Sequence, residues 1–381
     1  MNTVKQNAFL AIVMAAILST QMTSAFADQV VRIGFAAPLT GASARAGKDA
    51  ENGARLALEE IGSKGLVVAG SKVTLELDSE DDANDPRTAT QVAQKLVDDK
   101  VVAVVGHGNS GTSIPAAKIY SDAGIAQLSP SATNPQYTLQ GFKTTFRVVA
   151  TDAQQGPALA DYASNTLKLK RVAVVDDATA YGQGLADEFV KKAKALGVTV
   201  ISRDATSDKT IDFRAILTKI KAEAPDAIMY GGMDATVGPF AKQAAQLAIK
   251  AKILAGDGAC TEQLASLASS AAENVICSEP GIAIEKMPGG AAFEKKYEAR
   301  FHEPIQLYAP FAYDAVYVVV DAMKRANSTD PAKIVVALPQ TDYRGVIGEI
   351  QFDEHGDIKH GAISVYTYRA GKKVFIDSLK M

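Results

Sequence analysis

Val101-Val-Ala-Val-Val-Gly-His-Gly-Asn-Ser-Gly111 is the stretch from which the fold of this 381-residue chain is best predicted. A helix-like run, Ser113 to Ser121, follows it, and a second apolar run, Gly124 to Leu128, ends in Ser129-Pro-Ser-Ala-Thr133. Each of the two apolar runs is a short strand that ends in a turn rich in Gly, Ser and Thr. A strand, a helix and a second strand in this order predict an open α/β sheet, in which ligands bind beyond the carboxyl ends of the strands.

Three hydroxyl side chains, those of Ser110, Ser131 and Thr133, fall in the turns after these two strands. Because the carboxyl ends of parallel strands meet at one edge of a sheet, we expect the three hydroxyls to face one crevice. Hydroxyls and free backbone N–H groups suit a small anion such as a carboxylate. The same residues are also ordinary turn formers and helix N-caps, and that interpretation stays open.

The N-terminus has the pattern of an export signal. Lys5 precedes an apolar run, 8–18, that is too short to span a bilayer, and Ala25-Phe-Ala27 is a small-x-small cleavage site. We therefore expect cleavage after Ala27 and a soluble periplasmic protein that is a monomer. Loss of Lys5 leaves 39 of the 40 basic residues against 43 acidic ones, and no basic cluster indicates nucleic acid.

The rest of the chain alternates strands and helices, which is typical of βαβ units and parallel sheets. About ten such strands are too many for one core, so the sequence predicts an α/β protein with two doubly wound parallel-sheet lobes. Expected strands are 30–35, 73–77, 101–105, 124–128, 144–149, 171–175, 198–202, 227–230 and 252–255, followed by a β tail at 349–352, 363–368 and 374–376. Asp85-Pro86 predicts the start of a helix to about Val97, and Thr151-Asp-Ala-Gln154 predicts a capping box at the start of another. The run 307–324 is expected to be an apolar core helix.

The sequence does not favour a dinucleotide site, a hydrolase triad or a calcium loop. Gly106-His-Gly-Asn-Ser-Gly111 matches G-x-G-x-x-G, but no acid follows the next strand as a dinucleotide site requires. Ser110 lacks the G-x-S-x-G spacing of a nucleophile elbow, and the four histidines do not suggest a triad. Asp78 to Asp85 is interpreted as a solvated acidic turn, because it lacks the spacing of a calcium loop. We expect no enzyme, metal or cofactor.

The second half of the chain supplies complementary groups. Tyr181 lies just before a helix, at the end of the loop after the strand 171–175, and Asp257 stands between two glycines at the end of the strand 252–255. A carboxylate in that place would take a cationic group, although a simple turn Asp remains the alternative. Hydroxyls from one lobe, with an acid and an aromatic ring from the other, would suit a zwitterion. Cys260 and Cys277, the only two cysteines, predict a disulfide in an oxidising compartment, with two free thiols as the alternative.

Taken together, the motifs resemble those of the periplasmic leucine/isoleucine/valine-binding proteins, the solute receptors of branched-chain amino acid ABC transporters. The resemblance covers nearly all of the chain after residue 27. No motif is decisive alone, but the ordered set is specific: Pro38-Leu-Thr-Gly41, Asn52-Gly-Ala-Arg-Leu-Ala57, Asp81-Asp-Ala-Asn-Asp-Pro86, Val105-Gly-His107, Ser129-Pro-Ser-Ala-Thr133, Gln155-Gly-Pro157, Tyr181-Gly-Gln-Gly184, Tyr230-Gly-Gly232 and Phe352-Asp-Glu-His-Gly-Asp357.

The resemblance implies a type I periplasmic binding protein with a three-crossing hinge. Residues 28–148 and 281–360 would form the first lobe, and residues 149–280 and 361–381 the second. The residues that match Ser110, Ser131 and Thr133 would hold the ligand's carboxylate and orient its ammonium. Asp257 would pair with the ammonium, and Tyr181 would close over the ligand from the second lobe.

This chain departs from the family pattern at several pocket positions. Asn84 and Asn109 stand where close relatives carry a disulfide, and Asn109 is counted with the ligand-binding residues. Ala46 and Met233 replace pocket tyrosines, and Met233 would contact the ligand's side chain. We expect a receptor for a branched-chain aliphatic L-amino acid (Leu, Ile or Val) that serves an ABC importer permease. An aromatic amino acid, an amide, or a ligand-sensing domain are the alternatives.

Overall fold

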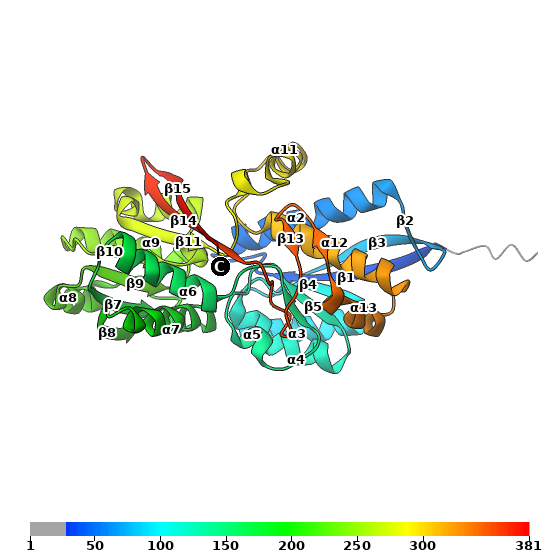
Figure 1. Ribbon diagram of the computed structural model, residues 1–381, viewed down its shortest axis with the longest axis horizontal. Coiled ribbons are helices and arrows are strands. Elements are labelled where there is room, and N and C mark those ends of the chain that lie inside the picture. Colours follow the sequence, from blue (N-terminus) through cyan, green and yellow to red (C-terminus); the bar gives the residue numbers. More distant parts are fainter. Residues whose placement is uncertain (1–27, 381) are drawn as a thin grey trace, which may run out of the picture.

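The computed structural model describes residues 28–380, so the predicted signal segment, 1–27, lies outside the described residues. Two α/β halves lie end to end along the long axis of the molecule (Figure 1). The first contains a six-stranded sheet in the order β2-β3-β1-β4-β5-β6, parallel except for β2. Its strands are β1 (Gln29–Ala37), β2 (Leu66–Val68), β3 (Ser71–Asp81), β4 (Ala103–Gly106), β5 (Ala126–Ser129) and β6 (Thr145–Arg147).

Helices cover both faces of this sheet, as the predicted doubly wound pattern requires. Helices α2 (Ala44–Lys64), α11 (Gly290–Phe301) and α12 (Ala309–Ala326) contribute to the larger apolar core, and α3 (Pro86–Asp98) and α4 (Ser110–Asp122) to the smaller one. Burial of the apolar stripes of these helices on the sheet is the main source of their stability. The shorter helices of this half are α5 (Gln136–Leu139) and α13 (Pro331–Ala337), and the two-stranded sheet β12 (Tyr343–Arg344) and β13 (Glu349–Ile350) follows them.

The second half contains a seven-stranded sheet in the order β15-β14-β11-β10-β9-β7-β8. Strands β7 to β11 are parallel, and β14 and β15 add an antiparallel hairpin at one edge. The strands are β7 (Arg171–Asp176), β8 (Thr199–Ala205), β9 (Ala227–Gly231), β10 (Lys252–Ala255), β11 (Val275–Glu279), β14 (Ala362–Arg369) and β15 (Lys372–Lys380). Its helices are α6 (Asp152–Asp161), α7 (Ala180–Ala195), α8 (Arg214–Glu223), α9 (Asp234–Gln246) and α10 (Glu262–Ala268).

The chain passes between the two sheets three times: after β6, after β11 and after β13. The predicted fold class, two doubly wound parallel-sheet lobes joined by three crossings, is therefore confirmed. The hairpin β14–β15 belongs to the second sheet although it follows helices of the first half. The lobe boundaries at residues 148/149, 280/281 and 360/361 stay a prediction.

Two predicted helix starts are formed by the side chains that the sequence indicated. The Asp85 carboxylate accepts the Arg87 and Thr88 N–H groups at the start of α3. Thr151 and Gln154 form a reciprocal capping box at the start of α6. A side-chain oxygen at an N-cap satisfies N–H groups that have no partner within the helix, so these starts depend on local sequence alone.

The acidic stretch that was interpreted as a solvated turn is in part a strand. β3 continues to Asp81 because it pairs with β1 as far as Ala37. Asp82, which follows β3, is fully buried and contacts the His107 ring. Strand pairing and burial in the folded chain thus override the turn preference of a run of acids.

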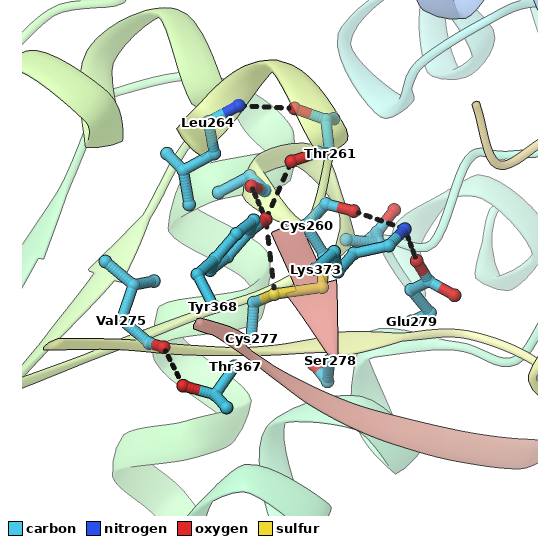
Figure 2. Close-up of a disulfide and its surroundings, with 12 residues drawn as sticks. Cys260, Thr261, Leu264, Val275, Cys277, Ser278, Glu279, Thr367, Tyr368 and Lys373 are labelled. Atoms are coloured by element: carbon cyan, nitrogen blue, oxygen red, sulfur yellow. Dashed lines mark hydrogen bonds and ion pairs between the residues drawn. A yellow bond between two sulfur atoms is a disulfide. The ribbon is translucent and has the colours of Figure 1, made fainter. Parts of the chain in front are cut away.

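Cys260 and Cys277 form the predicted disulfide, with an S–S distance of 2.05 Å (Figure 2). It joins the residue after the short 3₁₀ turn Asp257–Ala259 to the middle of β11. Next to it, the Lys373 ammonium contacts both the Cys260 carbonyl, at 3.2 Å, and the Glu279 carboxylate, at 2.6 Å (Figure 2). Strand β10, the turn after it, β11 and β15 are thereby joined at one point.

None of the helices in residues 28–380 combines the length and the apolar character that a membrane crossing requires.

Candidate functional site between the two sheets

A pocket lies where the carboxyl ends of strands from both sheets face each other. It is lined by residues that follow β1, β3 and β4 in the first sheet and β9 and β10 in the second, together with the segment before α12. Asn109, Met233 and Asp257 are among the predicted site residues that line it. Other residues that line the pocket are Pro38, Ala42, Arg45, Ala46, Asn84, Gly258, Leu307 and Tyr308.

Asp257 occupies the second-sheet side of the pocket and is only 2 % exposed. Its Oδ1 accepts hydrogen bonds from the Gln155 amide, at 2.7 Å, and from the Tyr181 hydroxyl, at 2.9 Å. Its Oδ2 accepts one from the Tyr308 hydroxyl at 2.6 Å. Tyr181 is therefore held against Asp257, and its own oxygen accepts the Gly258 N–H at 3.0 Å.

All three side-chain donors to Asp257 are neutral, and within the described chain no Lys or Arg forms an ion pair with it. Burial raises the pKa of the Asp257 carboxyl, and the hydrogen bonds from Tyr308, Gln155 and Tyr181 act in the opposite direction. A buried carboxylate without a cation carries a large desolvation cost. The geometry therefore suits a ligand that brings a positive charge.

The turns after β4 and β5 carry the predicted site residues Ser110, Ser131 and Thr133, which are all buried. Gly108 and Asn109 of the first turn line the pocket, but these three residues are not among its lining residues. The Ser131 hydroxyl donates to the Gly108 carbonyl at 3.1 Å, which joins the two turns directly. The Ser110 oxygen accepts the Asn134 N–H at 3.2 Å. The Thr133 hydroxyl is buried without a hydrogen-bond partner among the residues that the structure describes.

Helix α4 begins at Ser110, three residues earlier than the predicted Ser113, because Asn109 caps it. The Asn109 side-chain oxygen accepts the Thr112 N–H at 3.1 Å. The start of a helix presents unpaired N–H groups and a partial positive charge, which favours an anion. The Asn109 amide also donates to the Asn84 side chain, so a hydrogen bond connects the two positions where the family resemblance suggested a missing disulfide.

His107 fixes the first of these turns from below. Its carbonyl accepts hydrogen bonds from the Ser113 and Ser129 hydroxyls, both at 3.1 Å. Its ring nitrogens are both engaged, Nδ1 by Asp82 at 2.9 Å and Nε2 by the Tyr120 hydroxyl at 3.0 Å. His107 is therefore a buried support of the turn.

Arg147, at the end of β6, holds the second turn and is fully buried. Its guanidinium donates to the carbonyls of Ala132, at 2.7 Å, and Asn134, at 3.0 and 3.1 Å, which flank Thr133 in the chain. It forms an ion pair with Asp357 at 2.5 Å. The motif Phe352–Asp357, which the sequence alone left without a role, thus supplies the acid that fixes this arginine.

Two hydrogen bonds that involve side chains cross from one half of the protein to the other at the pocket. One is the bond from Tyr308, just before α12, to Asp257 after β10. The other runs from the Asn134 amide to the Ala180 carbonyl, at 2.5 Å. The two halves are therefore in direct contact around the site.

The sequence did not identify Gln155 or Tyr308 as site residues. Gln155 was noted only within the motif Gln155-Gly-Pro157, and Tyr308 was assigned to an apolar core helix. Asp49 accepts the backbone N–H groups of residues 306–309 and so fixes the segment that carries Tyr308. No local pattern at Tyr308 distinguishes a site tyrosine from a core tyrosine.

Part of the pocket lining is aliphatic. Pro38, Ala42, Ala46, Leu307 and Met233 form it. A side chain on Gly258 would meet the Met233 sulfur at 2.6 Å, so a glycine is needed beside Asp257. Arg45 and Asp234 add a charged rim to the pocket.

A group of acids that suggests a metal site lies elsewhere. Within the described residues, ligand atoms of Asp78, Glu80 and Asp99 lie within 4.8 Å of one another. The Lys95 ammonium, however, contacts Glu80 at 2.9 Å and Asp99 at 2.5 Å. A lysine therefore already contacts two of the three acids and offsets part of their charge.

Two doubly wound lobes with a ligand pocket between them define the class of bilobal solute-binding proteins. A family model described as periplasmic binding protein matches residues 30–373, and the chain belongs to this family. It is similar to Leu/Ile/Val-binding protein homolog 1 of Brucella melitensis biotype 1, with 36% identity over 91% of this chain and 92% of that protein.

Solved structures agree with this assignment. The leucine binding protein LivK of Thermotoga maritima matches with a TM-score of 0.85 and 30% identity, over 92% of this chain and 98% of that one. The branched-chain amino acid transporter substrate binding protein LivJ of Streptococcus pneumoniae, in complex with isoleucine, matches with a TM-score of 0.83 and 29% identity. That match covers 93% of this chain and 99% of LivJ. The fold is that of a type I periplasmic binding protein.

Proposed function

We propose that this protein is a periplasmic receptor that binds leucine, isoleucine or valine between its two lobes and delivers it to the permease of an ABC importer. The observation that carries the proposal is Asp257, a buried carboxylate at the interlobe pocket that contacts only neutral donors. The ammonium group of an amino acid would supply the missing positive charge. The similarity to Leu/Ile/Val-binding proteins supports the same ligand class.

The opposite end of the ligand would meet the turns after β4 and β5. The Ser110 and Thr133 hydroxyls, with the N–H groups at the start of α4, offer donors for a carboxylate. Ser131 would join them only by turning its hydroxyl away from the Gly108 carbonyl. The ligand's side chain would contact Ala46, Leu307 and Met233. Because methionine is flexible and polarizable, Met233 also leaves an aromatic amino acid or an amide as the alternative ligand.

A receptor fits the site better than a hydrolase that uses Ser110. The Ser110 hydroxyl lies next to the Asn134 N–H, and both ring nitrogens of His107 are bound elsewhere. A nucleophilic serine needs a base within hydrogen-bond reach. We therefore propose that the protein is not an enzyme. We also propose that it is exported, cleaved after Ala27 and active as a monomer. A ligand-sensing role remains the second candidate, because it would use the same two lobes.

Calorimetric titration with each of the common L-amino acids, and with simple carboxylic acids, tests this proposal. We expect saturable binding of leucine, isoleucine and valine with one ligand per chain, and no binding of isocaproate, which is leucine without its ammonium group. If the three branched-chain amino acids do not bind, the proposed ligand is wrong. If isocaproate binds as tightly as leucine, the assignment of Asp257 to the ammonium is wrong.

A further inference from the structure

Asp152, the first residue of α6, is a second buried acid at this site. It is 0 % exposed, and its backbone N–H donates to the Thr133 carbonyl at 2.8 Å. Its Oδ1 accepts a hydrogen bond from the Gln155 amide at 3.2 Å. The same Gln155 nitrogen donates to Asp257, so one amide group connects the two carboxyls.

The other oxygen of Asp152, Oδ2, is buried and receives no hydrogen bond of good geometry within residues 28–380. The Thr133 hydroxyl, which is buried without a partner as well, is the donor that faces this carboxyl, and it lowers the pKa of Asp152. Such an atom is costly unless the group is neutral or a donor reaches it. Burial, and then repulsion from Asp257, raises the pKa of Asp152 to about 8. Ionisation of both carboxyls costs free energy, because two negative charges would then lie close together in the protein interior. The pKa values that a titration measures are therefore properties of the pair.

The charged groups around Asp152 and Asp257 do not remove the cost of ionising both carboxyls. Arg147 favours ionisation of Asp152, but its own charge is matched by Asp357. Lys373 is paired with Glu279. The remaining titratable groups that face the pair are the hydroxyls of Tyr181 on α7 and Tyr308 before α12, which are neutral.

The contacts Asp152–Gln155 and Gln155–Asp257 lie within the second half, so they do not depend on contact between the lobes. We infer that Asp152 and Asp257 together hold one proton in the ligand-free protein and release it to solvent when the ligand's ammonium group enters. This inference rests on the proposed function, because the incoming charge is the ammonium of an amino acid. The ammonium arrives fully protonated, both carboxyls become ionised beside it, and one proton leaves. Binding is thereby coupled to pH.

The sign of the coupling follows from linkage. A pair that loses a proton on binding holds its ligand more tightly as pH rises, up to the pKa of the ligand-free pair near 8. The Kd for leucine should therefore fall by up to about tenfold per pH unit between about pH 6 and pH 8. Above that range it should become constant.

Titration calorimetry at pH 7 in buffers of different ionisation enthalpy measures the proton count directly. We expect release of nearly one proton per leucine from the wild type and none from Asp152→Asn, which mimics the protonated acid. The Kd values of the two proteins should converge at low pH and diverge as pH rises, whereas a purely structural role would shift Kd equally at every pH. Asp152→Glu should retain proton release.

Asp314→Asn is the matched control, because Asp314 is a buried acid with a pKa raised to about 7 that lies outside the pocket. It should leave proton release on binding unchanged. Wild type that binds leucine without proton release, or Asp152→Asn that still releases a proton, would overturn the inference.

Infrared spectroscopy separates this inference from the proposed ligand. Without ligand, the wild type should show a protonated-carboxyl band that titrates near pH 8 and that is absent from Asp152→Asn. Absence of that band from the wild type overturns the inference whatever the ligand. Failure of leucine to bind while the band is present overturns only the proposed ligand.

Discussion

At the scale of single residues, Asp257 is the group on which recognition of an amino acid depends. Its three neutral donors orient the carboxylate but leave its negative charge uncompensated. Those donors come from α6, from α7 and from the segment before α12, so the acid senses both halves of the molecule. A change at this one side chain should therefore alter binding more than a change at any of the hydroxyls opposite.

Asp257→Ala should weaken leucine binding by two orders of magnitude or more, because removal of one partner of a buried charge pair costs about 3–5 kcal/mol. Calorimetric titration measures the change, and Asp314→Asn, which alters a buried acid outside the pocket, serves as the control that should leave the Kd unchanged. Binding by Asp257→Ala that equals the wild type would mean that Asp257 is only a turn residue.

At the scale of secondary-structure elements, the turn Phe352–Asp357 fixes β6 and the turn after β5. The Gly356 carbonyl accepts the Arg147 N–H at 3.0 Å, and a side chain on Gly356, where φ is +92°, would meet the Thr145 carbonyl at 2.1 Å. The Asp357 carboxylate then holds the Arg147 guanidinium, which holds the carbonyls on both sides of Thr133. The third chain crossing is thus coupled to the anion side of the pocket.

Asp357→Asn should lower the free energy of unfolding by about 3 kcal/mol, because it leaves the fully buried Arg147 without its acid. It should also weaken leucine binding, since the turn that carries Thr133 loses its support. Urea unfolding measures the first effect. Asp321→Asn breaks the half-exposed pair with Arg325 and should cost less than about 1 kcal/mol. Equal effects of the two substitutions would contradict this account of Arg147.

The disulfide acts on the element next to Asp257. Cys260 ends the short turn that begins at Asp257, and the bond closes a loop with a sequence separation of 17. In the chain-entropy model a loop of this size contributes about 3 kcal/mol. The double substitution Cys260→Ala with Cys277→Ala should lower the free energy of unfolding by about that amount in urea. An unfolding curve that does not change on reduction of the wild type would show that the bond contributes nothing measurable.

At the scale of the whole molecule, ligand binding between two lobes implies closure about the three crossings. The two halves touch through Tyr308 with Asp257 and through Asn134 with Ala180, and these contacts must break if the lobes separate. Figure 1 shows that the halves lie end to end, so a hinge motion changes the length of the molecule. Closure should therefore be visible in solution.

Solution scattering should show a smaller radius of gyration for the wild type at saturating leucine than without it. Asp257→Ala at the same leucine concentration should keep a radius of gyration close to the ligand-free value, because its weakened binding leaves most molecules without ligand. A wild-type profile that does not change with ligand would count against closure on binding.

The sequence by itself determined the features that depend on neighbouring residues. Alternating apolar strands and amphipathic helices predicted two doubly wound lobes, and the starts of α3 and α6 followed from Asp85 and from the Thr151–Gln154 box. Placement of Asp257 at the pocket followed from the rule that strand ends carry ligand groups, whereas Asn109 and Met233 were expected there from the family resemblance. These signals act over a few residues, and burial only reinforces them.

Only the tertiary structure decided which distant residues meet. The Tyr308 hydroxyl contacts Asp257 from the other half of the protein. Gln155 binds Asp257 although 102 residues separate them in the sequence, and 210 residues separate Arg147 from Asp357. The acidic run after residue 77 became a strand because β1 offered a partner for pairing. No local pattern encodes such contacts, because each depends on the order of strands in a sheet and on the packing of one lobe against the other.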